Sequence, residues 1–322
     1  MKKFLLKRLL VSILVLFGVS ILLYALIRSM PGDYISNTFA NNPNATPEMI
    51  ANLKALYGLD KGIVEGYVNW LAKALQGDFG VSFLYGRPVA EIIKSKMWIS
   101  FSLAFPAFLL QFLLAIPFGV VSAAKQYSKL DYAVTVFAMV GISLPSFFFA
   151  ALLQRIFAMG LGWLPLQGMK TAREDYEGLR HILDMAQHFV LPVIVLTVTG
   201  MGSLMRYTRT SMLEVLRADY IRTARSKGMS EVKVVGRHGF RNTLIPLITI
   251  AGSMLPSLFS GAIITEGIFA IDGLGYTSLQ ALRQGDIPFI MGFNIFLAVL
   301  TLLGTLLADI SYGLADPRVR LH

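Results

Sequence analysis

Residues 219–246 read DYIRTARSKGMSEVKVVGRHGFRNTLIP, a polar and basic stretch that stands between two long apolar runs. The acidic residues in and just before this stretch are Glu214, Asp219 and Glu231. The basic residues are Arg209, Arg217, Arg222, Arg225, Lys227, Lys233, Arg237 and Arg241. A chain that keeps such a segment between hydrophobic runs presents it to lipid headgroups or to another protein.

The composition around this stretch is that of a membrane protein. Of the 322 residues, 55% are hydrophobic and only 15% are charged, and the mean hydropathy is +0.62. An ordinary soluble domain is less apolar. Cysteine is absent, which excludes a disulfide framework and a thiolate metal site. The net charge of +10 favours basic cytoplasmic loops over nucleic-acid binding.

Six apolar runs have roughly the 20 residues that a bilayer crossing requires. They are residues 9–27, 98–123, 132–159, 189–205, 244–268 and 288–312. No small-residue cleavage site follows the first run, so we interpret it as a retained span rather than a signal peptide. The sequence therefore predicts an all-α polytopic membrane protein with six transmembrane helices.

Lysine and arginine are concentrated in alternate connecting segments. They occur before the first run, at Lys125 and Lys129, throughout 206–241, and at Arg318 and Arg320. The positive-inside rule places these segments, and both termini, in the cytoplasm. We expect a multi-pass protein of the cytoplasmic membrane.

The polar region after the first run is predicted to be a small extracytoplasmic insert of short helices. Thr46 can cap a helix that begins at Pro47. A second helical pattern ends at Gly77 and has one apolar face, formed by Val64, Tyr67, Val68, Leu71 and Leu75. The insert is too small to bury a core, so it must rest on the membrane helices or on a partner.

These observations divide the chain into four regions. Residues 1–30 hold the cytoplasmic N-terminus and the first span, and residues 31–96 form the insert. Residues 97–313 form a five-helix transmembrane core that contains the loop 208–241. Residues 314–322 are a cytoplasmic tail.

Few polar residues lie at membrane depth, and no ionisable group stands convincingly at the middle of a span. A proton- or sodium-driven carrier holds its coupling ion on such a group. Energy for transport must then come from another protein, unless the chain is a passive channel. By polarity and depth, the residues expected to line a pathway are Gln111, Ser143, Ser146, Thr197, Thr199 and Ser257.

Proline and glycine interrupt the interiors of four spans. These residues are Pro106, Pro117, Gly141, Pro145, Pro192, Gly200, Pro256 and Gly261. They either curve the helices or allow kinked helices to surround a pathway that opens and closes. The sequence alone does not separate these two interpretations.

Motifs for catalysis are absent from the sequence. No G-x-x-x-x-G-K-[ST] phosphate loop and no G-x-S-x-G occurs. The four histidines, His181, His188, His238 and His322, lack metal-ligand spacing. We therefore expect no nucleotide, metal or catalytic site in this chain.

Within the opening stretch, the residues predict a short helix over 220–227. Asp219 is expected to cap this helix, and Gly228 to end it in the left-handed conformation. Tyr220, Thr223, Ala224 and Lys227 would share one side of it. Such a helix could lie in a groove of another protein, whereas a merely basic loop would fix topology and touch anionic lipid.

A second helix is predicted after the glycine. Ser230 is expected to cap it. Its apolar face would consist of Val234, Val235 and Phe240 and would lead into the fifth span. The chain would thus make one sharp turn between two helices.

The order of residues in this region resembles the coupling loop of ABC-importer permeases, in the form found in the oligopeptide and dipeptide permease family. The matching elements are Ala224-x3-Gly228, Arg237-His238, Arg241-Asn242 and Leu244-Ile245-Pro246. The general importer motif begins Glu-Ala-Ala, where this sequence has Arg222-Thr223-Ala224. The acidic contact with the ATPase is therefore not carried over.

The resemblance extends along the whole chain. Further matching motifs are Pro31-Gly32-Asp33, Gly58-Leu59-Asp60, Trp70-Leu71, Gly77-Asp78-Phe79-Gly80 with Ser82, Gly86-Arg87-Pro88-Val89, Glu266-x-Ile268-Phe269, Gly273-Leu274-Gly275, Asp309-x2-Tyr312 and Asp316-Pro317-Arg318. The long loop after the first span is similar to that of the first of the two permease subunits in the family.

The resemblance implies a type I ABC importer permease fold. It also implies that the chain is a permease subunit of an ATP-driven, binding-protein-dependent importer. Such an importer would move di- or oligopeptides across the cytoplasmic membrane by alternating access. It implies a heterodimer with a second homologous permease subunit, two cytoplasmic ABC ATPase subunits and an extracytoplasmic solute-binding protein. ATP and Mg would be bound by the ATPases and none by this chain. A non-peptide ligand (glutathione, a nickel chelate or a glycoside) and a self-sufficient secondary transporter stay open as alternatives.

The resemblance also implies site residues. The ATPase-coupling helix would consist of Asp219, Tyr220, Arg222, Thr223, Ala224, Arg225, Lys227 and Gly228, and its supporting residues would be Arg237, His238, Arg241, Asn242 and Pro246. Near the other end, Glu266 and Asp272 are candidates for an outer gate or docking contact, or for a structural turn. Residues 31–96 and 269–288 are expected to form the platform on which the binding protein docks.

Overall fold

The computed structural model describes residues 2–29, 35, 46–56, 60–172, 174 and 176–315. Within these ranges all regular elements are helices, apart from one isolated β-bridge between Val81 and Pro88. The predicted motifs at 31–33, 58–59 and 316–318 lie outside the described residues, as does residue 322.

The first span and the insert contain three described helices: α1 (Lys2–Ser29), α3 (Pro47–Leu56) and α4 (Ile63–Ala74). The predicted cap of α3 is confirmed, because the Met49 amide donates to Thr46 Oγ1 at 3.2 Å and Pro47 is the first helical residue. Gly77 follows α4 with a φ of 81°, a conformation that favours glycine.

In the part of the chain that the structure describes, five helical stretches are long and apolar enough to cross a membrane, and a bent pair would make a sixth span. The long uninterrupted helices of the core are α5 (Val89–Ala124), α8 (Gly178–Leu216) and α15 (Ile287–Ala315). The prediction of six spans holds only if the bent pair counts as one.

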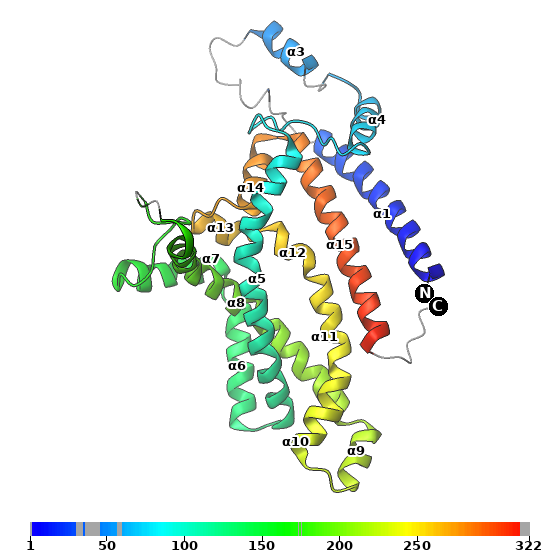
Figure 1. Cartoon of the computed structure of the whole chain (residues 1–322), viewed down its shortest axis with the longest axis vertical. Helices are drawn as coiled ribbons and strands as arrows, with labels where there is room; N and C mark the ends of the chain where they lie inside the picture. The colour runs from blue at the N-terminus through cyan, green and yellow to red at the C-terminus, as the bar shows by residue number, and fades with distance from the viewer. Residues whose placement is uncertain are drawn as a thin grey trace.

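The bent pair corresponds to the predicted third span. It consists of α6 (Lys129–Ser143), α7 (Ser146–Leu153) and the π-helix η1 (Gln154–Gly160), and it bends by 100° between α6 and α7. Leu144 is extended at the bend and Pro145 precedes α7, since proline disfavours helical conformation in the residue before it. Figure 1 shows α7 leaving the top of α6 sideways.

The predicted fifth span is also discontinuous. It is divided into α11 (Arg241–Ser253), α12 (Leu255–Ser260) and α13 (Ile263–Ile268). Pro256 stands at the start of α12, and Gly261, with a φ of 77°, ends it. The last short helix, α14 (Leu274–Gln284), precedes α15.

Close helix contacts hold the core together. A Cβ atom on Gly202 in α8 would lie 2.5 Å from the Ala138 carbonyl oxygen in α6, and one on Gly304 in α15 would lie 2.4 Å from the Gly252 carbonyl oxygen in α11. Three buried apolar clusters connect α5 with its neighbours, and one of them joins the start of α5 to α14 and α15. The other two lie further along α5. One joins α5 to α7, α8 and the segment after α13, and the other joins it to α6, α8 and α11.

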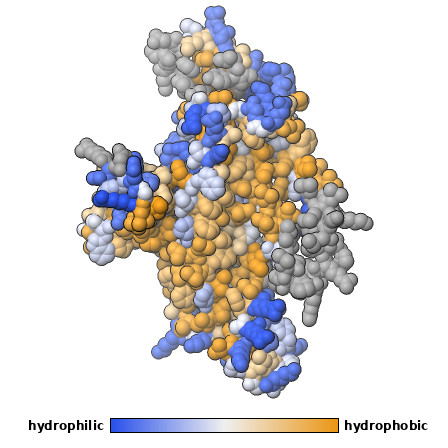
Figure 2. Space-filling view, viewed as in Figure 1, coloured by the Kyte–Doolittle hydropathy of each residue, from blue (hydrophilic) through white to orange (hydrophobic). Residues whose placement is uncertain are grey.

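The two ends of the molecule differ in what they carry (Figure 1). Helices α3, α4 and α14 lie at one end, and α9 (Asp219–Ser226) and α10 (Glu231–Lys233) lie at the opposite end. Figure 2 shows a broad hydrophobic surface between two hydrophilic ends. The stretch that opened the sequence analysis therefore sits at one polar extremity.

Candidate functional site: the α9 corner

The α9 corner, residues 217–240, is a small folded unit rather than an open loop. On the inner side of α9, Ile221 and Ala224 are buried against Val234, and Leu216 and Met229 pack beside them. Burial of this apolar contact fixes α9 against the end of α8 and the start of the next helix.

The start of α9 differs from the sequence prediction. Ala218 occupies the cap position, and Asp219 is the first helical residue. The Asp219 carboxylate therefore lies in the first helical turn, where a negative charge is favourable to the helix dipole. It also pairs with Arg222 at 3.7 Å, although both side chains are largely exposed.

Gly228 ends α9 as predicted. Its φ is 72°, and its amide donates to the Arg225 carbonyl at 2.9 Å. Arg225 then closes the corner across the glycine, because its guanidinium donates to both Glu231 carboxylate oxygens, at 2.7 and 3.3 Å. These hydrogen bonds from Arg225 hold the pKa of the Glu231 carboxyl below its ordinary value.

The second predicted helix exists in a modified form. Ser230 is in the cap position of α10, but its carbonyl, not its side chain, accepts the amides of Lys233 and Val234, at 2.9 and 3.0 Å. After one turn the helix continues as the π-helix η2 (Val234–Phe240) and then as α11. The hydrophobic periodicity of the sequence did not predict this π-helix, whose turns are wider than those of an α-helix.

Helix η2 rests directly on the end of α8. A Cβ atom on Gly239 would lie 2.5 Å from Met212 Cε, and buried Thr243 donates to the Gly239 carbonyl at 3.2 Å. Among the predicted supporting residues, Asn242 donates to the His238 carbonyl at 2.8 Å. Arg237 and Arg241 are exposed, and Pro246 lies within α11. The corner is thus continuous with two long helices.

The outward surface of the corner is basic with two apolar side chains. Tyr220 is 47% exposed and Val232 is 83% exposed. The exposed basic residues around them are Arg222, Arg225, Lys227, Lys233, Arg237 and Arg241. Thr223 is exposed, whereas Ala224 is buried. Of the four residues predicted to share one side of α9, Ala224 thus differs from Tyr220, Thr223 and Lys227, because it packs on Val234.

A buried ion pair lies at the same end of the bundle. Arg209 of α8 donates to both carboxylate oxygens of Asp131 in α6, at 2.7 and 2.9 Å. Ser122 at the end of α5 also donates to Asp131, and the Tyr127 amide donates at 2.9 Å. Sequence reasoning missed this group: Ser128 and Asp131 form a recognisable helix-start pair, but the partner Arg209 is remote in sequence.

The residues predicted to line a pathway do not form one cluster. In α5, Gln111 donates to the Leu196 carbonyl of α8 at 2.9 Å, so it lies beside Thr197 and Thr199. Ser143 and Ser146 flank the α6–α7 bend, and Ser257 is on α12. Within the described residues, Gln111 Oε1 and Thr197 Oγ1 are buried without a hydrogen-bond partner.

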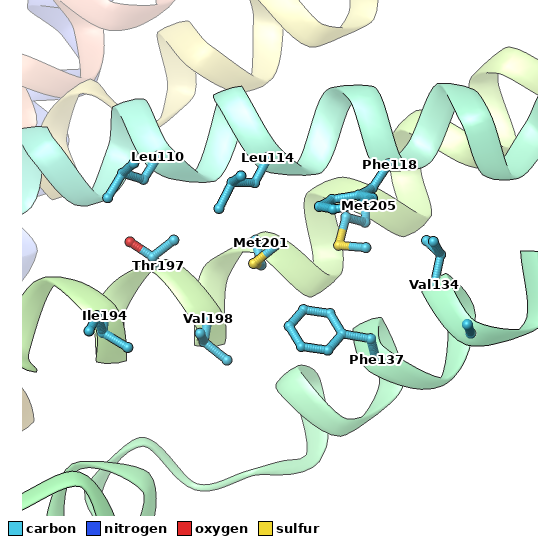
Figure 3. Close-up of a pocket in the computed structure, with 11 residues that line it drawn as sticks. Leu110, Leu114, Phe118, Val134, Phe137, Ile194, Thr197, Val198, Met201 and Met205 are labelled. Atoms are coloured by element: carbon cyan, nitrogen blue, oxygen red, sulfur yellow. The ribbon is translucent and has the colours of Figure 1, made fainter. Parts of the chain in front are cut away.

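Thr197 also lines an open apolar groove of about 550 Å³ between α5, α6 and α8. Figure 3 shows Leu110 and Leu114 on one wall, Ile194 and Val198 on another, and Phe137 at one end. The groove offers a single polar side chain to a ligand.

At the opposite end, Glu266 is fully buried and has a structural role. It accepts hydrogen bonds from Ser100 Oγ at 2.7 Å, from the Tyr276 amide at 2.9 Å and from the Ala262 amide at 3.2 Å. These contacts join α5, α13 and α14. Asp272 is exposed and pairs with Lys96.

A second buried carboxylate, Asp286, connects the insert to α15. It accepts hydrogen bonds from Ser82 Oγ at 2.5 Å and from the Phe83 and Leu84 amides, both at 3.1 Å. It also accepts from the Phe289 amide at 3.2 Å. The sequence analysis named Ser82 as part of a motif but did not find its partner, because the two residues are far apart in the chain.

No group of three or more metal-ligating side chains lies together in the part of the chain that the structure describes. The buried carboxylates Asp131, Glu266 and Asp286 are instead satisfied by hydrogen bonds from neighbouring hydroxyl, amide or guanidinium groups. What the α9 corner offers is a fixed, basic and partly apolar surface suited to another protein.

Comparison with known proteins identifies the family. Residues 115–321 match the family described as binding-protein-dependent transport system inner membrane component, and residues 1–104 match its N-terminal family. The chain belongs to this family and is a membrane-spanning permease component of a transport system. The resemblance noted in the sequence is thereby confirmed.

Individual relatives are similar over their full length. The chain is 38% identical to the oligopeptide transport system permease protein AppB of Bacillus subtilis, with 99% of each chain covered. It is 34% identical to the di/tripeptide transport system permease protein DppB of Pseudomonas aeruginosa, again with 99% of each covered.

A solved structure supports the fold. An inward-facing form of the MetNI methionine ABC transporter matches with a TM-score of 0.53 and 17% identity, covering 70% of this chain and 97% of that one. The predicted type I importer permease fold is confirmed.

Proposed function

We propose that the chain is the permease subunit of an ATP-driven importer that moves peptides across the cytoplasmic membrane. The observation that carries the proposal is the α9 corner, which is internally packed yet presents an exposed basic surface. The names of the relatives AppB and DppB support peptides as the ligand class. The alternative ligands, glutathione, nickel chelates and glycosides, have no observation in their favour.

The partners follow from this assignment. Two ABC ATPase subunits lie in the cytoplasm and bind ATP and Mg, and one of them receives α9 in a surface groove. A second homologous permease completes the transmembrane pathway. A solute-binding protein delivers the peptide at the opposite end, where the insert and residues 269–288 form its platform. Both termini of the chain are cytoplasmic, and the chain itself catalyses no reaction.

The corner explains how force would enter the membrane part. Because Ile221, Ala224 and Val234 are packed together, a push on α9 is not absorbed by a flexible loop. It passes to α8 through Leu216 and to α11 through η2. Alternating access then results from movement of packed helices relative to one another.

Peptide uptake by vesicles containing all subunits tests the proposal. We expect uptake to require both ATP inside the vesicle and the binding protein outside. Transport by the purified chain without any ATPase would contradict it.

A pair of tyrosine variants tests the role of α9. Tyr220→Asp changes a half-exposed side chain on α9, whereas Tyr127→Asp changes a 72% exposed side chain in the turn between α5 and α6. We expect the first variant to assemble but to lose both peptide uptake and peptide-stimulated ATP hydrolysis, and the second to retain both. Equal activity of the two variants would rule out α9 as the coupling element.

A further inference from the structure

The insert contains an apolar helix face that nothing in the described part of the chain covers. On α4, Val64 is 78% exposed and Val68 is 57% exposed, and Leu75, the residue that caps the end of α4, is 80% exposed. The opposite side of the helix is polar, with Glu65, Asn69 and Lys73 exposed, while a third side packs on α1. The apolar residues follow one another at helical spacing, so they form a stripe.

The depth of α4 is set by its contacts with α1. Tyr67 Oη and Ser20 Oγ share a hydrogen bond of 2.8 Å, and the Tyr67 ring lies 6.3 Å from that of Phe17. Both Phe17 and Ser20 belong to the apolar span Leu10–Ser29. Ser20 is nine residues before Ser29, which corresponds to about 13 Å along the helix.

The approach of the two helices is close. A Cβ atom on Gly66 would lie 2.3 Å from Tyr24 Oη, and the Tyr24 ring also contacts the rings of Tyr67 and Trp70. Helix α4 therefore lies beside the membrane-spanning part of α1 rather than above its end.

The segments on both sides of α4 are held at a similar level. Before it, Arg28 near the end of α1 donates to the Lys61 carbonyl at 2.7 Å. After it, Phe79 packs on Gly292, where an added Cβ would lie 3.1 Å from Phe79 Cβ. Gly292 is inside the span Ile287–Ala308. The segments that flank α4 therefore lie near the ends of α1 and α15.

We infer that the Val64–Val68–Leu75 face of α4 is embedded in the lipid leaflet at this end of the bundle. On the neighbouring span α1, the apolar side chains of Leu22 and Leu26 are each 64% exposed. Figure 2 shows the hydrophilic side of the α4 region bordering the hydrophobic band of the spans. Tyr67 and Trp70 are the side chains found at such boundaries.

Depth argues against a soluble partner on this face. A protein arriving from the aqueous side would have to pass the headgroups to reach a helix that contacts Ser20. An in-plane amphipathic helix, by contrast, buries its apolar side in the headgroup and acyl-chain boundary and keeps its polar side in water. The inference requires only that α1 spans the membrane and does not depend on the transported ligand.

Spin labelling tests this inference directly, because the chain contains no cysteine. The variants Val68→Cys, Lys73→Cys and Leu26→Cys are labelled with a nitroxide in the full chain, reconstituted into vesicles of phosphatidylcholine and phosphatidylglycerol. Collision with oxygen, which partitions into lipid, is compared with collision with a water-soluble nickel chelate. Leu26 supplies the lipid reference and Lys73 the aqueous reference on the same helix as Val68.

The label at Val68 should match that at Leu26, with a high ratio of oxygen to nickel collisions, while the label at Lys73 should show the reverse. A Val68 ratio like that of Lys73 would place the face in water and overturn the inference. Low collision rates with both reagents would show a protein cover and would also overturn it. A fall in the collision rates at Val68 on addition of the solute-binding protein would show that this protein covers the face, and it would also overturn the inference.

Discussion

Gly228 holds a backbone conformation that ordinary residues avoid, with a φ of 72°, and α9 ends there. Gly236, eight residues later in η2, has open space where a Cβ would lie and no positive φ. The free-energy cost of replacing glycine by alanine should therefore differ between these two positions.

Replacement of each glycine by alanine measures this difference. Gly228→Ala should destabilise the corner by about 1–2 kcal/mol, the cost of the left-handed conformation for a residue with a Cβ. Gly236→Ala should be neutral or stabilising by up to about 1 kcal/mol, because alanine favours helix. Hydrogen exchange of the amides in residues 219–231 provides the measurement, and equal exchange in both variants would contradict the expectation.

At the level of the element, the α9 corner contains a titratable pair. Hydrogen bonds from Arg225 lower the pKa of Glu231 in the folded corner relative to the unfolded chain. A lowered folded-state pKa means that the pair stabilises the corner fully above the unfolded pKa and that this stabilisation is lost as the pH falls through the folded pKa.

We therefore expect amide protection at 225–231 to be constant near neutral pH and to decrease below about pH 4. In Glu231→Gln the protection should be lower near neutral pH and should lack this decrease. Exchange rates corrected for the intrinsic effect of pH give the readout. A wild-type profile without any acid decrease would show that the pair contributes nothing to the corner.

The ion pair of Asp131 and Arg209 joins three elements at the base of the bundle. Arg209→Met leaves a carboxylate that is only 3% exposed without its partner, and the expected loss of stability is about 3–5 kcal/mol. Arg222→Met removes an ion pair in which the side chains of Arg222 and Asp219 are 80% and 97% exposed, respectively. This substitution should change the free energy of unfolding by no more than about 1 kcal/mol.

Unfolding in a series of detergent and denaturant mixtures compares the two methionine variants. The double variant Asp131→Asn with Arg209→Met removes both charges, so it should recover part of the stability lost in Arg209→Met alone. A double variant as unstable as the single one would show that Arg209 acts through packing rather than through its charge.

At the scale of the whole molecule, Asp286 is one of the contacts that join the insert to the membrane core. It anchors Ser82, Phe83 and Leu84 to the start of α15. Asp286→Ala should free this segment at a cost on the order of 3 kcal/mol, and chymotryptic cleavage after Tyr85 should accelerate by about a hundredfold. Asp78→Ala, which removes only a local bond to the Gly80 amide, should leave the cleavage rate nearly unchanged.

The sequence predicted those features whose cause is local. The end of α9 at Gly228 and the cap of α3 at Thr46 depend on single residues. The sequence also named the proline and glycine residues of the spans, but it did not show which of them would break a helix, and α5 and α8 are continuous through theirs. The long spans followed from hydropathy, and the fold class followed from the order of short motifs.

What the sequence could not predict depends on contacts between distant segments. The partners of Asp131, Asp286 and Glu266 come from other helices, and the inward position of Ala224 depends on Val234. The apolar pattern of α4 was visible, but its packing on α1 through Tyr67 and Ser20 was not. The residue pattern of one helix shows which of its sides is apolar, but it does not show which other segment that side packs against.

The length of α8 has a mechanical consequence. The helix is continuous over 39 residues, through Pro192, and it is pressed against α6 at Gly202. By the rise of an α-helix, this contact lies about 21 Å from Leu216 and about 36 Å from Gly178. If α8 pivots about this contact, a displacement of Leu216 moves Gly178 in the opposite direction. The movement of Gly178 is about 1.7 times larger, which is the ratio of the two distances.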